Sequence, residues 1–225
     1  MTGNGFIVTW EQDMADEIRR AAESCESLPY MVAVVGIPGS GKTTSATILG
    51  ELLQEQNVPT MVMPFDGYHL TMETLQSFPN ANEVIYRRGA PDTFDPQALQ
   101  CDLDKIRNGN DQIVKVPGFD HARGDPEPDA HVFDRAAHKV VICEGLYLLH
   151  DQDGWAEICH RFDRSIFVNA NIELCIQRLK LRNKCIPGYT EEEIDLRCEK
   201  VDRANAMIVA RSMTRADTIV ESRAS

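Results

Sequence analysis

Short apolar segments alternate with amphipathic ones along most of the chain. A short apolar run between turn-forming residues predicts a strand that is buried on both faces, because such a strand has no face for polar side chains. The segments that fit this description are 31–35, 60–65, 113–116, 139–143 and 165–168, with a shorter one at 218–220.

Helices are predicted between these strands, where apolar residues recur every three or four positions. Their expected ranges are 10–25, 42–56, 96–108 and 191–212, and another helix follows strand 165–168. Typical helix starts are present at Thr9, at Asp95 followed by Pro96, and at Thr190 with Glu193. The alternation predicts a parallel α/β sheet, whose ligands bind beyond the carboxyl ends of the strands.

The residues after the first predicted strand form a phosphate-binding motif. Gly36 to Thr43 read Gly-Ile-Pro-Gly-Ser-Gly-Lys-Thr and match the pattern G-x-x-x-x-G-K-[ST]. A glycine-rich turn between a strand and a helix directs backbone N–H groups and the positive end of the helix dipole at one anion. Lys42 adds a charge beside the β- and γ-phosphates, and the Thr43 hydroxyl is the expected ligand of Mg²⁺.

The alternative interpretation of this motif is a glycine-rich turn that binds nothing. On the functional interpretation, the nucleotide-binding residues are Gly36, Ile37, Pro38, Gly39, Ser40, Gly41, Lys42, Thr43 and Thr44.

Two acidic residues follow predicted strands. Glu144 comes after strand 139–143, where it would face the phosphate loop and hold Mg²⁺ as a Walker-B carboxylate; the alternative is a helix cap. Asp66 comes after strand 60–65, and Gly67 lets the chain turn away and leave the carboxylate at the mouth of the sheet. There Asp66 can accept the proton of a substrate hydroxyl during phosphoryl transfer, or it can form an Asx-turn.

Composition narrows the class of protein. The 225 residues are 43% hydrophobic and 26% charged, as expected of one globular domain, and the net charge of -12 argues against a nucleic-acid or anionic-membrane partner. Seven cysteines without C-x-x-C pairs suggest neither a zinc site nor a disulfide framework.

The sequence shows no leader-like start and no apolar stretch of membrane length, so the cytoplasm is expected. The segment 117–129 is expected to be a long functional loop.

Together these motifs resemble those of the uridine kinase, phosphoribulokinase and pantothenate kinase group. The features that carry the resemblance are the phosphate loop, Asp66 at a strand end, the loop Pro117-Gly118-Phe119-Asp120-His121 and the segment 141–145. Segments 66–69, 88–91, 93–95 and 145–149 are similar to those of uridine-kinase-like and fructose-transport-type kinases in particular. The resemblance extends from about residue 30 to 209.

This resemblance implies a P-loop NTPase-type three-layer α/β sandwich with a five-stranded, mainly parallel sheet and a helical lid at about 175–192. It implies one kinase domain over 1–225, with 1–29 as an N-terminal helical extension. The implied cofactors are ATP and Mg²⁺, and the implied partner is a small molecule that carries a hydroxyl group. Relatives occur as different oligomers, so a homo-oligomer is compatible with the resemblance.

The resemblance also assigns roles to single residues. Asp66 matches the catalytic base and can touch the metal, while Thr43 and Glu144 match the Mg²⁺ positions. Phe119 and His121 fall where relatives contact the phosphate acceptor with an aromatic residue and a histidine. Phenylalanine stands in place of the usual tyrosine, which removes one hydroxyl contact.

Further acceptor-site candidates lie in neighbouring segments. His69 and Arg88 belong to segments that cap the acceptor pocket in relatives, although single loop residues of these types also serve structural roles. Arg123 could bind an anionic acceptor or pair with Asp125. Asn205, which shares a helix face with Asp202, matches an asparagine that reaches the acceptor in pantothenate kinases.

Two arginines point to the lid. Arg178 and Arg182 are four residues apart and therefore lie on one face of the helix after strand 165–168. In the group, lid arginines close over ATP and neutralise charge on the transferred phosphoryl group, which assigns Arg178 to ATP binding and Arg182 to catalysis with Asp66 and Lys42. The alternative is a solvated basic face. The segment 183–188 stands where uridine kinases usually carry an Arg-Gly pair, so which cation acts is left open.

The sequence therefore predicts an ATP-dependent kinase that phosphorylates a hydroxyl of a small metabolite, such as a nucleoside, a sugar or a pantothenate-like alcohol. A nucleotide-switch GTPase or mechanical ATPase is the alternative from another class, but Asn183-Lys184 is followed by Cys185-Ile186 and not by the x-Asp of a GTPase base reader. A silent nucleotide-binding protein is the third hypothesis, and the presence of Lys42, Thr43, Asp66 and Glu144 argues against it.

Overall fold

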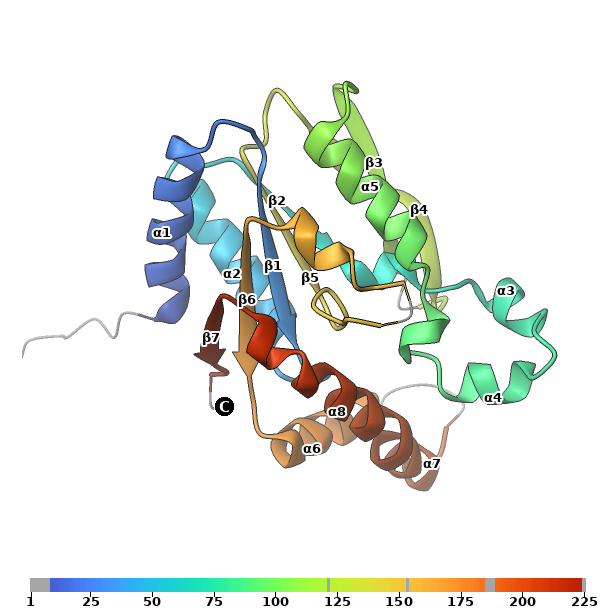
Figure 1. The fold of residues 1–225 in the computed structure, drawn as a ribbon. Coiled ribbons are helices and arrows are strands. Elements are labelled where there is room, and N and C mark those ends of the chain that lie inside the picture. The colour runs from blue at the N-terminus through green and yellow to red at the C-terminus, as the bar shows by residue number, and fades with distance from the viewer. Residues whose placement is uncertain (1–8, 121, 153, 185–188, 224–225) are drawn as a thin grey trace, which may run out of the picture.

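A five-stranded sheet with strand order β2-β5-β1-β6-β7 forms the centre of the molecule, and all neighbouring strands in it are parallel (Figure 1). The computed structural model describes residues 9–120, 122–152, 154–184 and 189–223. The strands of the sheet are β1 (Tyr30–Gly36), β2 (Thr60–Pro64), β5 (Val140–Gly145), β6 (Arg164–Asn169) and β7 (Thr218–Glu221).

The α-helices in the described residues are α1 (Trp10–Ser24), α2 (Lys42–Glu55), α3 (Met72–Gln76), α4 (Ala81–Tyr86), α5 (Pro96–Asn108), α6 (Ile172–Asn183), α7 (Glu191–Arg197) and α8 (Arg203–Arg211). None of these helices is both long and apolar enough to cross a bilayer.

Alternate residues of the central strands face two separate hydrophobic cores. Met31 and Val35 of β1 pack in a core with α5 and α8, whereas Val32 and Val34 pack in a second core with α1 and α2. All four side chains are fully buried. Both faces of the sheet are covered, which explains why the sequences of its strands are apolar along their whole length. The predicted three-layer α/β architecture is therefore confirmed.

The predicted ranges of the sheet strands and of α1, α2 and α5 agree with the structure to within about two residues. Two predicted helix starts are also confirmed. The Asp95 carboxylate accepts a hydrogen bond from the Ala98 N–H at 2.8 Å, and Thr190 with Glu193 forms a capping box. Thr9 precedes α1, but its side chain makes no capping hydrogen bond.

The predicted strand at 113–116 is confirmed, but its place in the fold and the prediction for 117–129 are wrong. β3 (Ile113–Asp120) and β4 (Asp125–Asp134) form a separate two-stranded antiparallel sheet, so 113–116 is no strand of the main sheet and 117–129 is no long loop. The register shifts between Val116 and Gly118, around Pro117. Proline and glycine are tolerated at such irregular positions, and cross-strand pairing maintains the strand where the local composition favours turns.

The predicted helix 191–212 is also not uniform. A π-helical turn, Cys198–Asp202, separates α7 from α8. Such a turn inserts one residue into the helical repeat and rotates all the residues that follow it, which a search for a 3.6-residue period does not detect. Asp202 therefore lies in the π-turn and Asn205 in α8, and they are not an ordinary pair on one regular helix.

Candidate functional site

The loop between β1 and α2 has a backbone that requires glycine. Gly39 and Gly41 have φ values of 80° and 86°, in the left-handed region. A Cβ on Gly39 would also come within 2.8 Å of the Cys175 carbonyl oxygen at the start of α6. The glycines of the motif thus serve both the turn and the close packing of α6 against it.

Neighbouring groups hold this loop in place. The Ser40 N–H donates to the Ile37 carbonyl at 3.1 Å, and Arg178 Nη1 donates to the Gly39 carbonyl at 3.3 Å. Ile37 and Ser40 are buried, whereas Thr44 is exposed in the first turn of α2. Arg178 is therefore in contact with the phosphate loop, which excludes the interpretation of this residue as part of a purely solvated basic face.

Glu144 lies at the end of β5, directly beside the loop. The Thr43 hydroxyl donates to Glu144 Oε1 at 3.1 Å. The Glu144 side chain is buried, and its Oε2 has no hydrogen-bond partner among the described residues. β5 ends in a turn and no helix starts there, so the alternative of a helix cap is excluded. A buried oxygen without a partner is a costly feature that a bound ligand would satisfy.

Two charged residues, Lys42 and Asp66, lie near enough to Glu144 to affect the pKa of its carboxyl. Burial raises the pKa of the Glu144 carboxyl, the positive charge of Lys42 and the Thr43 hydroxyl oppose that rise, and the negative charge of Asp66 adds to it. Lys42 and Asp66 therefore both act on the same buried carboxylate. Carboxylate and hydroxyl oxygens are the ligands that Mg²⁺ prefers, so this group of residues fits that ion.

Asp66 lies immediately after β2, in the short 3₁₀ turn Phe65–Tyr68. The Asp66 carbonyl accepts hydrogen bonds from the His69 backbone N–H at 3.2 Å and from His69 Nδ1 at 2.8 Å. A Cβ on Gly67 would lie 2.4 Å from the Pro117 carbonyl oxygen of β3. The turn that carries Asp66 is thus fixed by its own hydrogen bonds and by tight packing against the hairpin.

Three of the predicted acceptor-site residues come together next to this turn. The His69 ring lies 4.9 Å from the Phe119 ring, and the Arg88 guanidinium lies 5.6 Å from the centre of the same ring. Arg88 Nη2 also donates to the Leu70 carbonyl at 2.9 Å and to Asp125 Oδ1 at 2.8 Å. Arg88 therefore ties the residues after Asp66 to the β3–β4 hairpin.

Arg123 does not pair as the sequence suggested. Its Nε donates to the Asp120 carboxylate, and its Nη2 lies 3.8 Å from Glu127 Oε1. Asp125, the partner considered from the sequence, binds Arg88 instead. The antiparallel register explains the exchange, because Asp120 and Asp125 are paired positions at the end of the hairpin. His121 lies outside the described residues.

Asn205 is buried where α8 meets the turn after Arg88. Its side-chain nitrogen lies 3.5 Å from the position that a Cβ on Gly89 would take. Two groups that sequence reasoning missed hold the same turn. Arg197 Nη2 donates to the Arg88 carbonyl at 2.9 Å, and the Tyr147 hydroxyl donates to the Gly89 carbonyl at 2.7 Å. The available signal for Tyr147 was its place in segment 145–149, which follows a strand end and resembles the same segment of uridine-kinase-like kinases.

The two predicted lid arginines have different surroundings. Arg178 contacts the loop, whereas Arg182 lies one turn further along α6, is exposed, and donates from Nε to Asn183 Oδ1 at 3.3 Å. The segment 185–188, which was predicted to complete the lid, lies outside the described residues.

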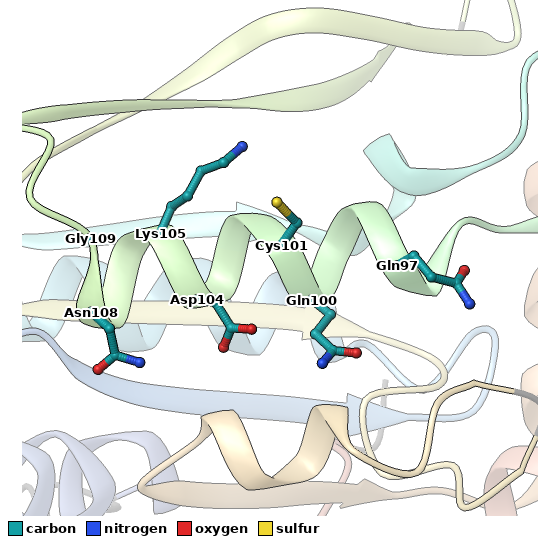
Figure 2. Close-up of a pocket in the computed structure, with 7 residues that line it drawn as sticks. All are labelled: Gln97, Gln100, Cys101, Asp104, Lys105, Asn108 and Gly109. Carbon is teal, nitrogen blue, oxygen red and sulfur yellow. The ribbon is translucent and has the colours of Figure 1, made fainter.

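A shallow depression elsewhere on the surface is not the predicted site. It has a volume of about 630 Å³ and runs along α5, with side chains that project from that helix (Figure 2). None of the predicted site residues lines it. The candidate site lies instead at the carboxyl edge of the main sheet, where β1, β2 and β5 end.

Comparisons with known proteins show which family and fold this chain resembles. The family model described as the phosphoribulokinase / uridine kinase family matches residues 31–225. "Putative uridine kinase C227.14" of Schizosaccharomyces pombe is 29% identical over 195 residues, which cover 85% of this chain and 82% of that protein. "ATP-dependent kinase YFH7" of Zygosaccharomyces rouxii is 32% identical over 127 residues, which cover 46% of this chain but only 34% of that protein.

A solved structure shows the same fold over almost the whole chain. A crystal structure of a "putative fructose transport system kinase" from Silicibacter sp. TM1040 superposes on this chain with a TM-score of 0.84 and 28% sequence identity. The superposition covers 95% of this chain and 100% of that one.

Proposed function

Since this chain belongs to the phosphoribulokinase / uridine kinase family, we propose that it is an ATP-dependent kinase that transfers the γ-phosphate of ATP to a hydroxyl of a small metabolite. One observation carries the proposal. The Thr43 hydroxyl is bonded to a buried Glu144 whose second oxygen has no partner in the described residues, and the charges of Lys42 and Asp66 both act on that carboxylate. The residues that we propose as phosphate ligand, metal ligands and base therefore lie close to one buried carboxylate beside the glycine-rich loop, which supports the proposal.

In this proposal Thr43 and Glu144 would hold Mg²⁺, with Asp66 beside them. A bound Mg²⁺ would neutralise phosphate charge and orient the γ-phosphoryl group. The backbone N–H groups of the loop and the Lys42 ammonium bind the β- and γ-phosphates.

The chemical step then requires one proton transfer. Asp66 accepts the proton of the acceptor hydroxyl while the oxygen of that hydroxyl forms a bond to the γ-phosphorus. The bond between the γ-phosphorus and the β–γ bridging oxygen breaks, and ADP is released. Arg178 and Arg182 neutralise charge on the phosphoryl group in this scheme. Closure of the lid excludes water, which would otherwise hydrolyse ATP.

The pairing of arginines supports an uncharged acceptor over a phosphate ester. Arg88 is bonded to Asp125, and Arg123 is bonded to Asp120 with Glu127 close by. These carboxylates already neutralise much of the charge of both arginines, which weakens the attraction of the arginines for an anionic acceptor. Nucleosides, sugars and other neutral alcohols are therefore the acceptor classes that the described residues favour.

The direct test measures ADP release from Mg·ATP and GDP release from Mg·GTP against a panel of nucleosides, sugars, sugar phosphates and vitamin alcohols. We expect one neutral hydroxyl compound to raise the rate well above the hydrolysis background with ATP. Preference for a sugar phosphate would contradict the proposed acceptor class. Nucleotide hydrolysis that no acceptor accelerates would instead favour an ATPase or GTPase.

Lys42→Ala should weaken ATP binding about tenfold or more, because a charge-assisted hydrogen bond to phosphate is lost. Titration calorimetry with ATP measures the affinity directly. Lys105→Ala is the matched control, since Lys105 lies on α5 away from the phosphate loop and is half exposed. Equal affinity of the two variants would show that Lys42 does not bind phosphate.

A further inference from the structure

The segment after β7 reaches the phosphate loop from the far edge of the sheet. β7 pairs with β6, and the ladder ends where Asn169 lies opposite Glu221. The Ser222 N–H then donates to the Asn169 carbonyl at 2.7 Å, and Asn169 Nδ2 donates to Glu221 Oε1 at 2.9 Å. These bonds fix the position of Ser222 at the carboxyl edge of the sheet, beside the end of β1.

Ser222 uses its hydroxyl to bind the loop backbone. Ser222 Oγ donates to the Ser40 carbonyl at 2.7 Å, much closer than its 3.5 Å separation from the Arg223 carbonyl. The carbonyl of Ser40 and the N–H of Gly41 belong to one planar trans peptide group and point in opposite directions. A bond that holds the Ser40 carbonyl outward therefore also sets the direction of the Gly41 N–H.

The peptide between Ser40 and Gly41 needs such a restraint. Gly41 has a φ of 86°, and glycine accepts the mirror-related negative value about as readily. A flip of this peptide would exchange the directions of its carbonyl and its N–H, which would put a carbonyl oxygen where a phosphate-binding N–H belongs. Glycine at position 41 does not prevent this flip, whereas the bond from Ser222 to the Ser40 carbonyl opposes it.

The residue after Ser222 is anchored in turn by a buried carboxylate. Arg223 Nη2 donates to Glu11 Oε2 at 2.8 Å, and Glu11 Oε1 accepts from the Ser45 hydroxyl of α2 at 3.2 Å. Glu11 is fully buried. Burial alone would raise the pKa of the Glu11 carboxyl, but the hydrogen bond from Arg223 and local bonds hold it below its ordinary value. The carboxylate therefore stays charged at neutral pH and keeps Arg223 in place.

We propose that Ser222 and the Arg223–Glu11 ion pair form a latch that sets the Ser40–Gly41 peptide in the orientation needed to bind nucleotide phosphate. Ser222 is a positioning residue in this proposal, since it acts through the loop backbone and not on the nucleotide. The latch joins α1, α2 and the segment after β7, which are far apart in the sequence. The inference rests on the proposed function only in taking the loop to be the nucleotide site.

The test compares Ser222→Ala with Ser222→Thr. Removal of the hydroxyl should raise the Kd for Mg·ATP about two- to tenfold, which corresponds to the loss of one neutral hydrogen bond. Threonine keeps the hydroxyl and should restore affinity to near the wild-type value. Ser24→Ala is the matched control, because the Ser24 hydroxyl bonds only carbonyls of its own helix at the end of α1.

A second readout separates positioning from general stabilisation. In the nucleotide-free Ser222→Ala protein, backbone amide hydrogen exchange should accelerate within 36–43 while the exchange of β1 and β5 stays unchanged. Arg223→Ala should weaken Mg·ATP binding in the same direction, and Arg223→Lys should weaken it less. Arg19→Ala, which breaks an exposed pair with Glu23 on α1, should leave the Kd unchanged.

The outcomes are distinct. Wild-type affinity in Ser222→Ala would overturn the latch, and so would equal loss of affinity in Ser222→Ala and Ser222→Thr, because the hydroxyl would then not matter. Failure of the wild-type protein to bind nucleotide would overturn the proposed function and the latch with it. Normal nucleotide binding with no effect of either Ser222 variant would overturn the latch alone.

Discussion

Asp66→Asn should lower turnover about a hundredfold or more while the affinity for Mg·ATP stays close to that of the wild type. Asparagine has nearly the same size and shape as aspartate but cannot take up the proton of an attacking hydroxyl. The turn that carries Asp66 is held through its backbone carbonyl by His69 and through the tight approach of Gly67 to Pro117. The substitution therefore leaves the turn intact and removes only the base.

Steady-state ADP release with the identified acceptor, together with a nucleotide titration, checks this expectation. Asp129→Asn is the matched control, because the Asp129 carboxylate on β4 is exposed and lies 3.3 Å from Lys115. A near-normal rate would remove Asp66 from the mechanism. If affinity for Mg·ATP fell as much as turnover, Asp66 would act mainly on the metal and not as a base.

The central sheet and the core of the site could be predicted because their signals are local. A strand buried on both faces must be apolar along its length, and a tight turn with positive φ values requires glycine, so β1 and the loop after it are readable from neighbouring residues. Asp66 and Glu144 could be found because a parallel sheet brings the ends of its strands to one edge. Their roles remain predictions that the experiments above test.

The features that sequence reasoning missed depend on contacts between distant residues. The β3–β4 hairpin is maintained by cross-strand pairing through a segment that contains Pro117 and Gly118. Arg123 pairs with Asp120, whereas Asp125, the partner considered for it from the sequence, binds Arg88, because the hairpin register decides which carboxylates each arginine can reach. The bond from Ser222 to Ser40 joins residues that no motif relates. Composition and periodicity carry no information about such pairs.

Glu144→Gln should have opposite effects on activity and on stability. Loss of a negatively charged Mg²⁺ ligand should lower Mg²⁺-dependent turnover about a hundredfold or more, since metal ligation supplies several kcal/mol of charge stabilisation. In the absence of metal, however, the wild-type carboxylate is buried with Oε2 unpartnered in the described residues and with Asp66 nearby. Glutamine removes this buried charge, which should raise the free energy of unfolding by about 1 kcal/mol or more. For a chain of this size, each kcal/mol corresponds to a rise in Tm of about 2–4 °C.

Thermal unfolding in a metal chelator, with and without added Mg²⁺, tests the stability half of this prediction. Glu51→Gln is the control, because Glu51 is exposed on α2. We expect the Gln variant to unfold at a higher temperature than the wild type without metal, and Mg·ATP to stabilise the wild type more than the variant. A Gln variant that is less stable in chelator would show that the carboxylate already has its partners in the folded protein.

The difference in stability between Glu144→Gln and the wild type should depend on pH, because the pKa of the Glu144 carboxyl is raised in the folded protein. A carboxyl whose pKa is higher in the folded than in the unfolded state binds more protons when folded, so its ionisation destabilises the fold as the pH rises. Above the raised pKa the wild type bears the full cost of a buried charge that the Gln variant lacks. Below the ordinary pKa of an unfolded glutamate, near about 4.3, both states are protonated and this cost vanishes. The stability advantage of Glu144→Gln in chelator should therefore shrink as the pH falls through the raised pKa toward this range, whereas an advantage that is constant with pH would arise from packing and not from charge.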